Sequence, residues 1–264
     1  MGWEGLSYRH AAFRSAAIAF VVVVSACGRA GFQARDDVAA SCTPIAGLLG
    51  YWTLDAADVV GRQVSDRSGH GADGTLVGTP LPALASGKIG DALDFTAVGA
   101  SNAVYLQIPP LVFDATPGAA VTVAMWMYRP LLPTPNDGAI YIPTDPARYD
   151  LYFTETGLCI NTGTSDCWGV IDSSLTDRWL HVAAVFVNGP SINDAIYIDG
   201  VARSLTCTSI APCVTSRTAM GPLMIGGGDP LYQYYGKLDD IRVYNRALSD
   251  GEVQNVFDGS VCPP

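Results

Sequence analysis

The sequence predicts an all-β fold made of two packed antiparallel sheets, and three observations support this. From Cys42 onward, short apolar runs of four to eight residues recur, rich in β-branched and aromatic side chains. Gly, Pro, Asn and Asp separate these runs, as expected of turns between strands. Helical spacing is confined to a short stretch near residues 249–257. Many strands with turns between them are typical of a sandwich or a barrel.

The clearest strands are predicted at residues 121–128, 181–187, 195–199 and 240–244. Residues 121–128 are apolar on both alternations, which predicts a strand in the middle of two packed sheets. Asp199 and Gly200 follow a strand directly and indicate a hairpin turn. Trp179 and His181 lie on one side of their strand, and we expect His181 to be a hydrogen-bonded structural residue rather than a ligand.

The only predicted helix lies near the end of the chain. Ser249 is a good N-cap, and Glu252 stands three residues later, as in a capping box. Leu248, Val253 and Val256 would then face the core. No linker divides residues 42–264, so we expect a single domain there, present as a monomer.

The N-terminal segment predicts export. Basic residues precede an apolar run at 16–24, which is too short for a membrane-spanning helix of about 20 residues and typical of a signal peptide. The run ends in the sequence VSACG at residues 24–28, and small residues before a Cys resemble the lipobox of bacterial lipoproteins. An ordinary secretory signal containing a Cys is the alternative.

The lipobox resemblance implies a specific processing. Residues 1–26 would be the signal peptide, and Cys27 would carry the lipid that anchors the protein. Residues 27–41 are small and polar and would form a tether. Gly28 follows the Cys where an Asp would suggest retention in the inner membrane, so the expected location is extracytoplasmic, at the outer membrane.

The number of cysteines agrees with the lipoprotein prediction. The sequence has seven, and an odd number in an exported protein needs an explanation. If Cys27 is lipidated, six remain. Cys159 and Cys167 bracket one polar stretch and Cys207 and Cys213 another, while Cys42 and Cys262 lie at the two ends of the domain. We therefore predict these three pairs as disulfides. A metal cluster is the rival interpretation, but the sequence has no Cys-x-x-Cys spacing.

Several segments in order resemble the laminin-G-like, concanavalin A-like jelly-roll domains of exported bacterial proteins. They are GYWTLD at 50–55, DRSGHGADGTL at 66–76, GDALDF at 90–95, VTVAMW at 121–126, RWLHVA at 178–183, IYIDG at 196–200 and GKLDDIRVYNRALS at 236–249. The resemblance covers nearly all of residues 42–262, and its last segment is the most specific. It implies a two-sheet antiparallel jelly roll for residues 42–264.

The resemblance also implies a structural calcium ion near the meeting point of the terminal segments. Calcium takes six to eight oxygen ligands, several of them from carboxylates. The candidate ligands are Asp55, Asp66, Asp73, Asp239 and Asp240. Asp residues that cap turns are the alternative interpretation. The chain departs from the family pattern at His70 and Ala72, where the family often has Asn, and this weakens that part of the site.

Catalytic motifs are missing from the sequence. Glycosidases usually place two carboxylates across the scissile bond, but after residue 26 the only Glu residues are Glu155 and Glu252, nearly a hundred positions apart. Asp239 and Asp240 are adjacent and would point to opposite faces of a regular strand. No Gly-x-Ser-x-Gly, His-Glu-x-x-His or P-loop motif is present. We therefore expect no enzyme activity.

A recognition function is the better hypothesis. Sugar rings stack on aromatic side chains, and loop-like stretches carry the candidates Tyr149, Tyr152, Trp168, Tyr232 and Tyr234. Packing within the domain is the alternative for each of them. The partner would be a glycan, or an extracellular protein bound through a flat patch. A nucleic acid is excluded, because 25 acidic residues outnumber 15 basic ones and the net charge is −10.

Overall fold

The computed structural model describes residues 42–98, 103–131, 137–145, 148–154, 157–161, 167–208, 213–214, 216–219, 222–227 and 233–262. All of them belong to one compact unit, Ala40–Pro264. The expected signal peptide, Cys27 and most of the tether lie outside the described residues. In the part of the chain that is described, no helix is long and apolar enough to cross a bilayer.

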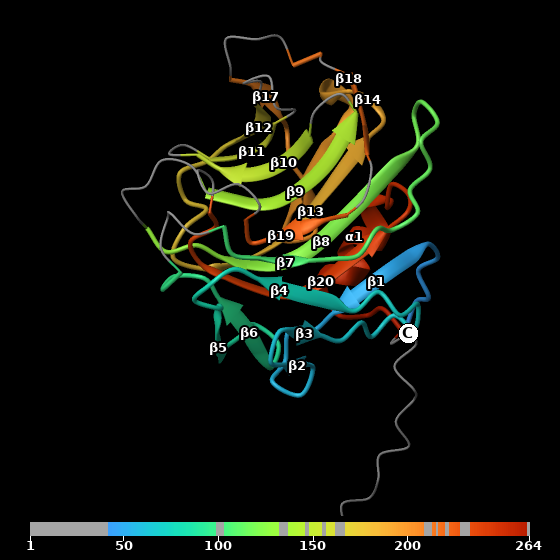
Figure 1. Ribbon diagram of the computed structural model, residues 1–264. Coiled ribbons are helices and arrows are strands. Elements are labelled where there is room, and N and C mark those ends of the chain that lie inside the picture. Colours follow the sequence, from blue (N-terminus) through green and yellow to red (C-terminus); the bar gives the residue numbers. More distant parts are fainter. Residues whose placement is uncertain are drawn as a thin grey trace, which may run out of the picture. The chain divides into compact units, whose positions relative to one another are not determined.

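The fold is a sandwich of two antiparallel sheets (Figure 1). The strands of the smaller sheet are β1 (Leu48–Trp52), β5 (Ala83–Ser86), β6 (Asp91–Asp94), β8 (Ala120–Tyr128), β13 (Trp179–Val187), β15 (Ala195–Ile198), β16 (Val201–Ala202) and β20 (Lys237–Tyr244). Their order is β16-β15-β13-β8-β20-β6-β5, and β1 pairs with β20. The last strand of the domain therefore lies beside the first.

The larger sheet contains β2 (Val59–Val60), β3 (Gln63–Val64), β4 (Gly74–Val77), β7 (Tyr105–Gln107), β9 (Asp137–Asp145), β10 (Arg148–Phe153), β11 (Gly157–Asn161), β12 (Trp168–Ile171), β17 (Thr206–Cys207) and β19 (Met224–Ile225). Their order is β17-β12-β11-β10-β9-β19-β7-β4-β3-β2. The short strands β14 (Gly189–Pro190) and β18 (Ser216–Ala219) pair with each other, and β18 joins β9. A 3₁₀ turn, η1, spans Ser191–Asn193.

The main core lies between the two sheets. Met125 and Ile241 from the smaller sheet belong to the same buried cluster as Leu106 and Leu151 from the larger sheet. Burial of such side chains is the main stabilising term of a sandwich. The prediction for residues 121–128 is confirmed in part: Val121–Met127 are all buried, and one face of the strand packs against the other sheet. The second cover of β8 is a helix rather than a second sheet.

That helix is α1 (Asp250–Phe257), on the outer face of the smaller sheet. The predicted capping box is present: Ser249 accepts a hydrogen bond from the Glu252 backbone N–H, and the Glu252 side chain accepts one from the Ser249 backbone N–H. Val253 packs against Ala124 and Ala183 of the sheet. The helix prediction is therefore confirmed.

The predicted hairpin between β15 and β16 is also confirmed. Ile198 pairs with Val201, and both Asp199 (φ 53°) and Gly200 (φ 80°) have positive φ angles. Asp199 also accepts a hydrogen bond from the backbone N–H of His181, which joins the turn to β13.

One sequence-based argument about β20 is wrong. The pairing of β20 with β8 shifts between Asp239 and Arg242, and Asp240 has a φ of 49°, so a β-bulge interrupts the strand. The core positions here are Leu238 and Ile241. Asp239 and Asp240 are therefore not on opposite faces of a regular strand, and their charges influence each other.

Candidate functional site

A pocket of about 300 Å³ lies where the first and last segments of the domain meet. We call it the junction pocket. Its lining comes from the segment around β1, the loop between β3 and β4, the end of β20 and the C-terminal segment: Pro44, Ile45, Gly47, Leu48, Tyr51, Ser68, His70, Arg242, Tyr244, Val261 and Cys262. Apolar and polar groups both contribute, as in many ligand-binding pockets.

Strand alternation supplies the aromatic and cationic side chains of the pocket. Tyr51 of β1 pairs with Arg242 of β20, and the next pair, Trp52 with Ile241, faces the core. The Arg242 guanidinium lies over the Tyr51 ring, 4.4 Å from its centroid, which is a favourable cation–π distance. Tyr244 is two residues further along β20 and therefore shares the outward face with Arg242.

The bulge residue Asp240 pairs with this cation. Its Oδ1 lies 3.3 Å from an Arg242 Nη2, and both side chains are largely buried. Burial and then the charge of Asp240 raise the pKa of Tyr51. Burial opposes the charge on Arg242, but the nearby Asp240 outweighs it, so the pKa of Arg242 is raised. Tyr51, Asp240 and Arg242 therefore form one polar group at the pocket.

The loop between β3 and β4 brings Ser68 and His70 to the pocket, and Asp66 holds the loop in shape. Asp66 accepts hydrogen bonds from the backbone N–H groups of Tyr51, Ser68 and Ala72 and from the Ser68 hydroxyl, at 2.7–2.9 Å. Burial raises the pKa of Asp66, but these bonds lower it more, and the net pKa is below its usual value. Both oxygens of Asp66 are therefore engaged within the loop.

Asp73 has a similar structural role. One carboxylate oxygen accepts from the backbone N–H of Asp66 at 2.8 Å, and the other accepts from the Gln63 side chain at 3.0 Å. The arrangement matches the turn-capping interpretation of Asp66 and Asp73. The expectation that all five candidate Asp residues share one metal site does not hold in this structure.

Asp55 and Asp239 lie together at a second place, under the loop before β6. Asp239 is fully buried, and its Oδ2 accepts from the backbone N–H groups of Lys88 and Ile89, both at 2.8 Å. Its Oδ1 is buried without a hydrogen-bond partner. Asp55 accepts from the backbone N–H of Asp91 at 2.8 Å.

Burial, together with the charges of Asp240 and Asp55, raises the pKa of Asp239 to about 7, although its two backbone hydrogen bonds oppose this. The loop before β6 packs directly against Asp55. A Cβ atom added to Gly90 of this loop would lie only 2.1 Å from an Asp55 oxygen. Among the described residues, no group of three or more acidic, His or Cys side chains is arranged to hold a metal ion. Asp239 does not line the junction pocket.

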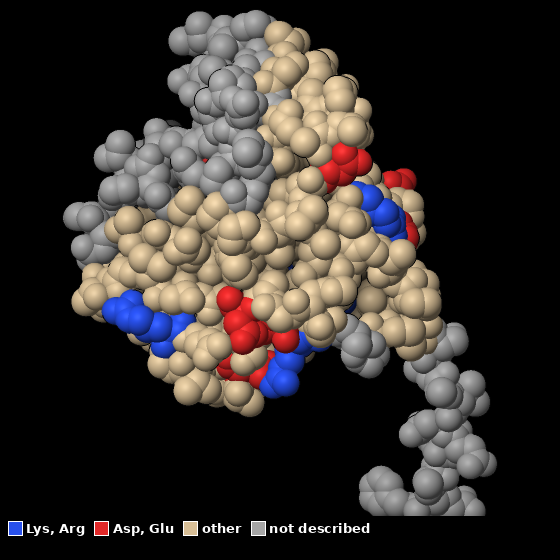
Figure 2. All heavy atoms as spheres, turned by 45° about the vertical axis from the view of Figure 1, so that its right-hand side comes forward, with Lys and Arg blue, Asp and Glu red and all other residues tan. Residues whose placement is uncertain are grey.

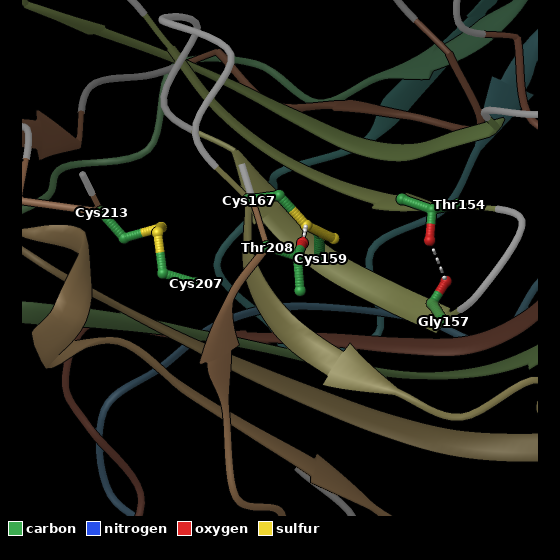
Figure 3. The surroundings of a disulfide bond; sticks show 7 residues. All are labelled: Thr154, Gly157, Cys159, Cys167, Cys207, Thr208 and Cys213. Carbon is green, nitrogen blue, oxygen red and sulfur yellow. Dashed lines mark hydrogen bonds between the residues drawn. A yellow bond between two sulfur atoms is a disulfide. The ribbon is translucent and has the colours of Figure 1, made fainter. Parts of the chain in front are cut away.

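The structure contains the three predicted disulfides. Cys42–Cys262 joins the ends of the domain next to the junction pocket. Cys159–Cys167 and Cys207–Cys213 lie at the β17 end of the larger sheet. Thr208, next to Cys207, donates a hydrogen bond from its hydroxyl to the Cys167 sulfur at 3.0 Å (Figure 3), and this bond connects the chain segments that carry the two short disulfides.

The aromatic side chains predicted to bind a ligand do not gather in one place. Tyr234 is fully buried next to Phe95 and Phe153, and its hydroxyl donates to the Tyr128 carbonyl at 3.0 Å; its assignment as a ligand-binding residue is wrong. Its neighbour Tyr232 lies outside the described residues, as does the side chain of Tyr149.

Trp168 and Tyr152 are both half-buried. Trp168 pairs with the core residue Ile160, which places it on the inner side of the larger sheet, and its indole N–H donates to the Asp194 carbonyl at 3.2 Å. Trp168, predicted to bind a ligand, is therefore partly packed within the domain and not a freely exposed side chain. Tyr152 pairs with Cys159, on the opposite side of the sheet from the core residue Leu151.

Tyr51, Arg242 and Tyr244 were not among the binding residues predicted from the sequence. For Arg242 and Tyr244 a signal was available, because both alternate with the apolar residues Ile241 and Val243 in the strand predicted at 240–244. Tyr51 lies in none of the strands predicted from the sequence, and only the pairing of β1 with β20 shows that the three side chains meet. Figure 2 shows acidic and basic side chains next to each other in small groups on the face that it presents.

Comparisons with known proteins decide the family. A laminin-G-like family model, described as the concanavalin A-like lectin/glucanases superfamily, matches residues 100–254, more than half of the chain. The chain belongs to this superfamily. The match includes Arg242 and Tyr244 but not Tyr51, Ser68 or His70. A search of curated proteins found no match.

Solved structures of this superfamily fold share the architecture at low sequence identity. Trypanosoma rangeli sialidase, in complex with the inhibitor DANA, matches with a TM-score of 0.57 and 16% identity over 83% of this chain. The match spans only 34% of the sialidase chain. Domain 4 of AbnA, an extracellular GH43 arabinanase from Geobacillus stearothermophilus solved with arabinotriose, matches with a TM-score of 0.51 and 21% identity. That match covers 80% of this chain and 98% of the domain.

Proposed function

We propose that this chain is a non-catalytic recognition protein of the cell envelope that binds carbohydrate in the junction pocket. The observation that supports this most is the pocket itself, which is lined by two tyrosines and an arginine together with apolar side chains. Sugars present both hydroxyl groups and C–H faces, and such a lining offers partners for each. The similar AbnA domain, whose structure is in complex with arabinotriose, supports the same ligand class.

The described acidic groups support a non-catalytic function. Glu252 forms an ion pair with Arg246 at 2.6 Å, and this pairing lowers the pKa of Glu252 to about 2. A glycosidase acid needs a raised pKa and access to the substrate. Asp239 has a raised pKa but is fully buried and lies outside the pocket lining. The other candidate, Glu155, lies outside the described residues.

We also propose that Cys27 carries a lipid and that residues 27–41 connect it to the domain. The lipobox-like sequence at 24–28 supports this, and disulfides persist in an exported protein. The location would be extracytoplasmic, at the outer membrane.

A structural calcium ion is proposed at Asp55 and Asp239. The buried Oδ1 of Asp239 lacks a hydrogen-bond partner, and a cation would satisfy it. Asp240 is excluded from the ligand set because it pairs with Arg242, and Asp66 and Asp73 are engaged in their loop. With only two carboxylates, backbone carbonyls and water would have to supply the remaining ligands.

A glycan array tests the carbohydrate proposal. Purified full-length protein is expected to bind a subset of glycans, and His70→Ala should weaken that binding because His70 lines the pocket. Tyr105→Phe is the control, since Tyr105 is a partly buried tyrosine in the larger sheet, outside the pocket. Loss of binding with Tyr105→Phe alone would move the site to that sheet. Binding to proteins but to no glycan would favour the alternative function, an adhesion protein.

A further inference from the structure

The junction pocket is small, and the two terminal segments that form one of its walls are bonded to each other. A volume of about 300 Å³ is at the lower end of the range for ligand pockets. Thr43 and Val261 form a parallel bridge, the Thr43 N–H donates to the Ser260 carbonyl at 2.8 Å, and Cys42–Cys262 links the two segments covalently. A ligand must therefore fit the existing space, which suits one ring-sized unit.

The charge of the lining comes from one side chain. Arg242 is the only Lys, Arg, Asp or Glu among the lining residues. Asp240 lies outside the lining but pairs with Arg242, and its side chain is only 9% exposed. Because the pair is largely buried, solvent screens its charges weakly. The guanidinium is thus already neutralised before any ligand arrives.

This pairing affects neutral and acidic ligands differently. A neutral ligand brings no charge that competes with Asp240 for Arg242, so it can occupy the pocket while the ion pair stays intact. A carboxylate would compete with Asp240 for Arg242 and would approach the charge of Asp240 itself, in a protein whose net charge is −10. Discrimination by an opposing buried charge is a common source of specificity.

We propose that the junction pocket binds a single neutral sugar unit and that Asp240 makes it reject acidic sugars. The inference rests on the proposed function and adds the ligand class and the residue that selects it. Ile45, Leu48 and Val261 provide the apolar wall for the C–H face of the ring.

The test measures affinities of full-length protein for methyl glycosides of glucose, galactose and arabinose, and for glucuronate and galacturonate, by ligand-observed NMR at low salt. We expect at least one neutral glycoside to bind roughly tenfold more tightly than either uronate. In Asp240→Asn, which keeps the side-chain shape and removes the charge, uronate affinity should rise roughly tenfold while neutral affinity changes less. Asp258→Asn, an exposed acidic residue outside the pocket, changes the net charge equally and should have no such effect.

Equal binding of neutral and acidic sugars by the wild-type protein would overturn the inference, and this result does not depend on whether Asp240→Asn folds. An unchanged uronate affinity in folded Asp240→Asn would overturn it as well. If glycans bind on the array through His70 but show no preference for neutral units, only this inference fails. If no sugar binds and the array is also negative, the proposed function fails with it.

Discussion

At the scale of single residues, the sequence does not by itself show whether an aromatic side chain faces the solvent or the core. Tyr234 and Trp168 lie in stretches that have the composition of loops, and this made both of them candidates for stacking on a sugar ring. In the structure Tyr234 packs between Phe95 and Phe153, because its segment returns to the core before β20 begins. Local composition does not reveal such a return.

His181 illustrates a residue that the sequence placed correctly. Its ring packs against Trp126 and Phe257, with centroid distances of 5.2 and 5.8 Å, and only 1% of the residue is exposed. It is structural, as predicted, although its Nδ1 has no hydrogen-bond partner and its contact with Asp199 is through its backbone.

The burial of His181 predicts a pH dependence of stability. Burial, followed by the charge of Arg242, lowers the pKa of His181 to about 4, whereas an unperturbed His titrates near 6.5. Between these values the unfolded chain binds the proton and the folded protein does not. His181 therefore contributes stability above pH 6.5 that is lost as the pH falls toward 4, by about 3 kcal/mol in total.

Chemical unfolding of wild type and His181→Gln at several pH values checks this. The difference in unfolding free energy between the two should shrink as the pH falls from 6.5 to 4. A difference for His181→Gln that is independent of pH would contradict the burial argument.

At the scale of elements, the strand and helix assignments were accessible from the sequence because their signals are local. Ser249 and Glu252 define the start of α1, and Asp199-Gly200 defines the turn between β15 and β16. The bulge at Asp240 was not accessible. It depends on how β20 pairs with β8, and that pairing joins residues more than a hundred positions apart.

The same bulge determines the proposed calcium site, since it separates the environments of Asp239 and Asp240. Calcium added to chelator-treated protein should raise the unfolding free energy, by about 3 kcal/mol when calcium exceeds its dissociation constant a hundredfold. Asp239→Asn should remove this gain, because it deletes the charge on the buried carboxylate. Differential scanning calorimetry with and without EDTA provides the measurement.

Asp73→Asn is the informative control for calcium. Asp73 was an equally good candidate in the sequence, but its oxygens bond to Asp66 and Gln63 in the structure. Asp73→Asn should keep the calcium-dependent rise in unfolding free energy. Its unfolding free energy should nevertheless be lower than that of the wild type, both with calcium and with EDTA. If Asp73→Asn loses the calcium-dependent rise in unfolding free energy, the result would favour the site of five Asp residues expected from the sequence.

At the scale of the whole molecule, the ends of the domain are joined both by β1 pairing with β20 and by Cys42–Cys262. The two cysteines are 220 residues apart. In the chain-entropy view, closing so long a loop stabilises the fold by about 5 kcal/mol. The double variant Cys42→Ser with Cys262→Ser should lose most of that, and denaturant unfolding under oxidising conditions measures it.

The double variant at Cys207 and Cys213 is the matched control for loop length. Its cysteines are only 6 residues apart, so the model predicts a loss of about 2 kcal/mol. Equal losses in the two double variants would mean that loop entropy is not the main contribution of the long disulfide.

Attachment to the envelope is a separate prediction for the whole chain. Cys27→Ser should move the protein from the membrane fraction to the soluble fraction, or block its processing, because the acyl acceptor is gone. Metabolic labelling with palmitate followed by fractionation checks both outcomes. Palmitate label that persists in Cys27→Ser would contradict the lipoprotein proposal.

The overall architecture could be predicted from the sequence because many weak segments occur in the family order, and each fits a strand or a turn. The disulfide pairs followed from their spacing. The junction pocket could not be predicted in this way, since Tyr51, His70 and Arg242 come from three segments that only the tertiary fold brings together. Contacts of this kind need the register of β1 on β20.

Chemical-shift mapping tests the central proposal, carbohydrate binding in the junction pocket, most directly. Isotope-labelled full-length protein is titrated with the glycan that gives the strongest array signal. The proposal predicts shift changes concentrated at Tyr51, His70, Arg242 and Tyr244, with the glycan recovered intact at the end of the titration. Shift changes confined to the outer side of the larger sheet, around Thr75 and Gln107, or cleavage of the glycan, would contradict it.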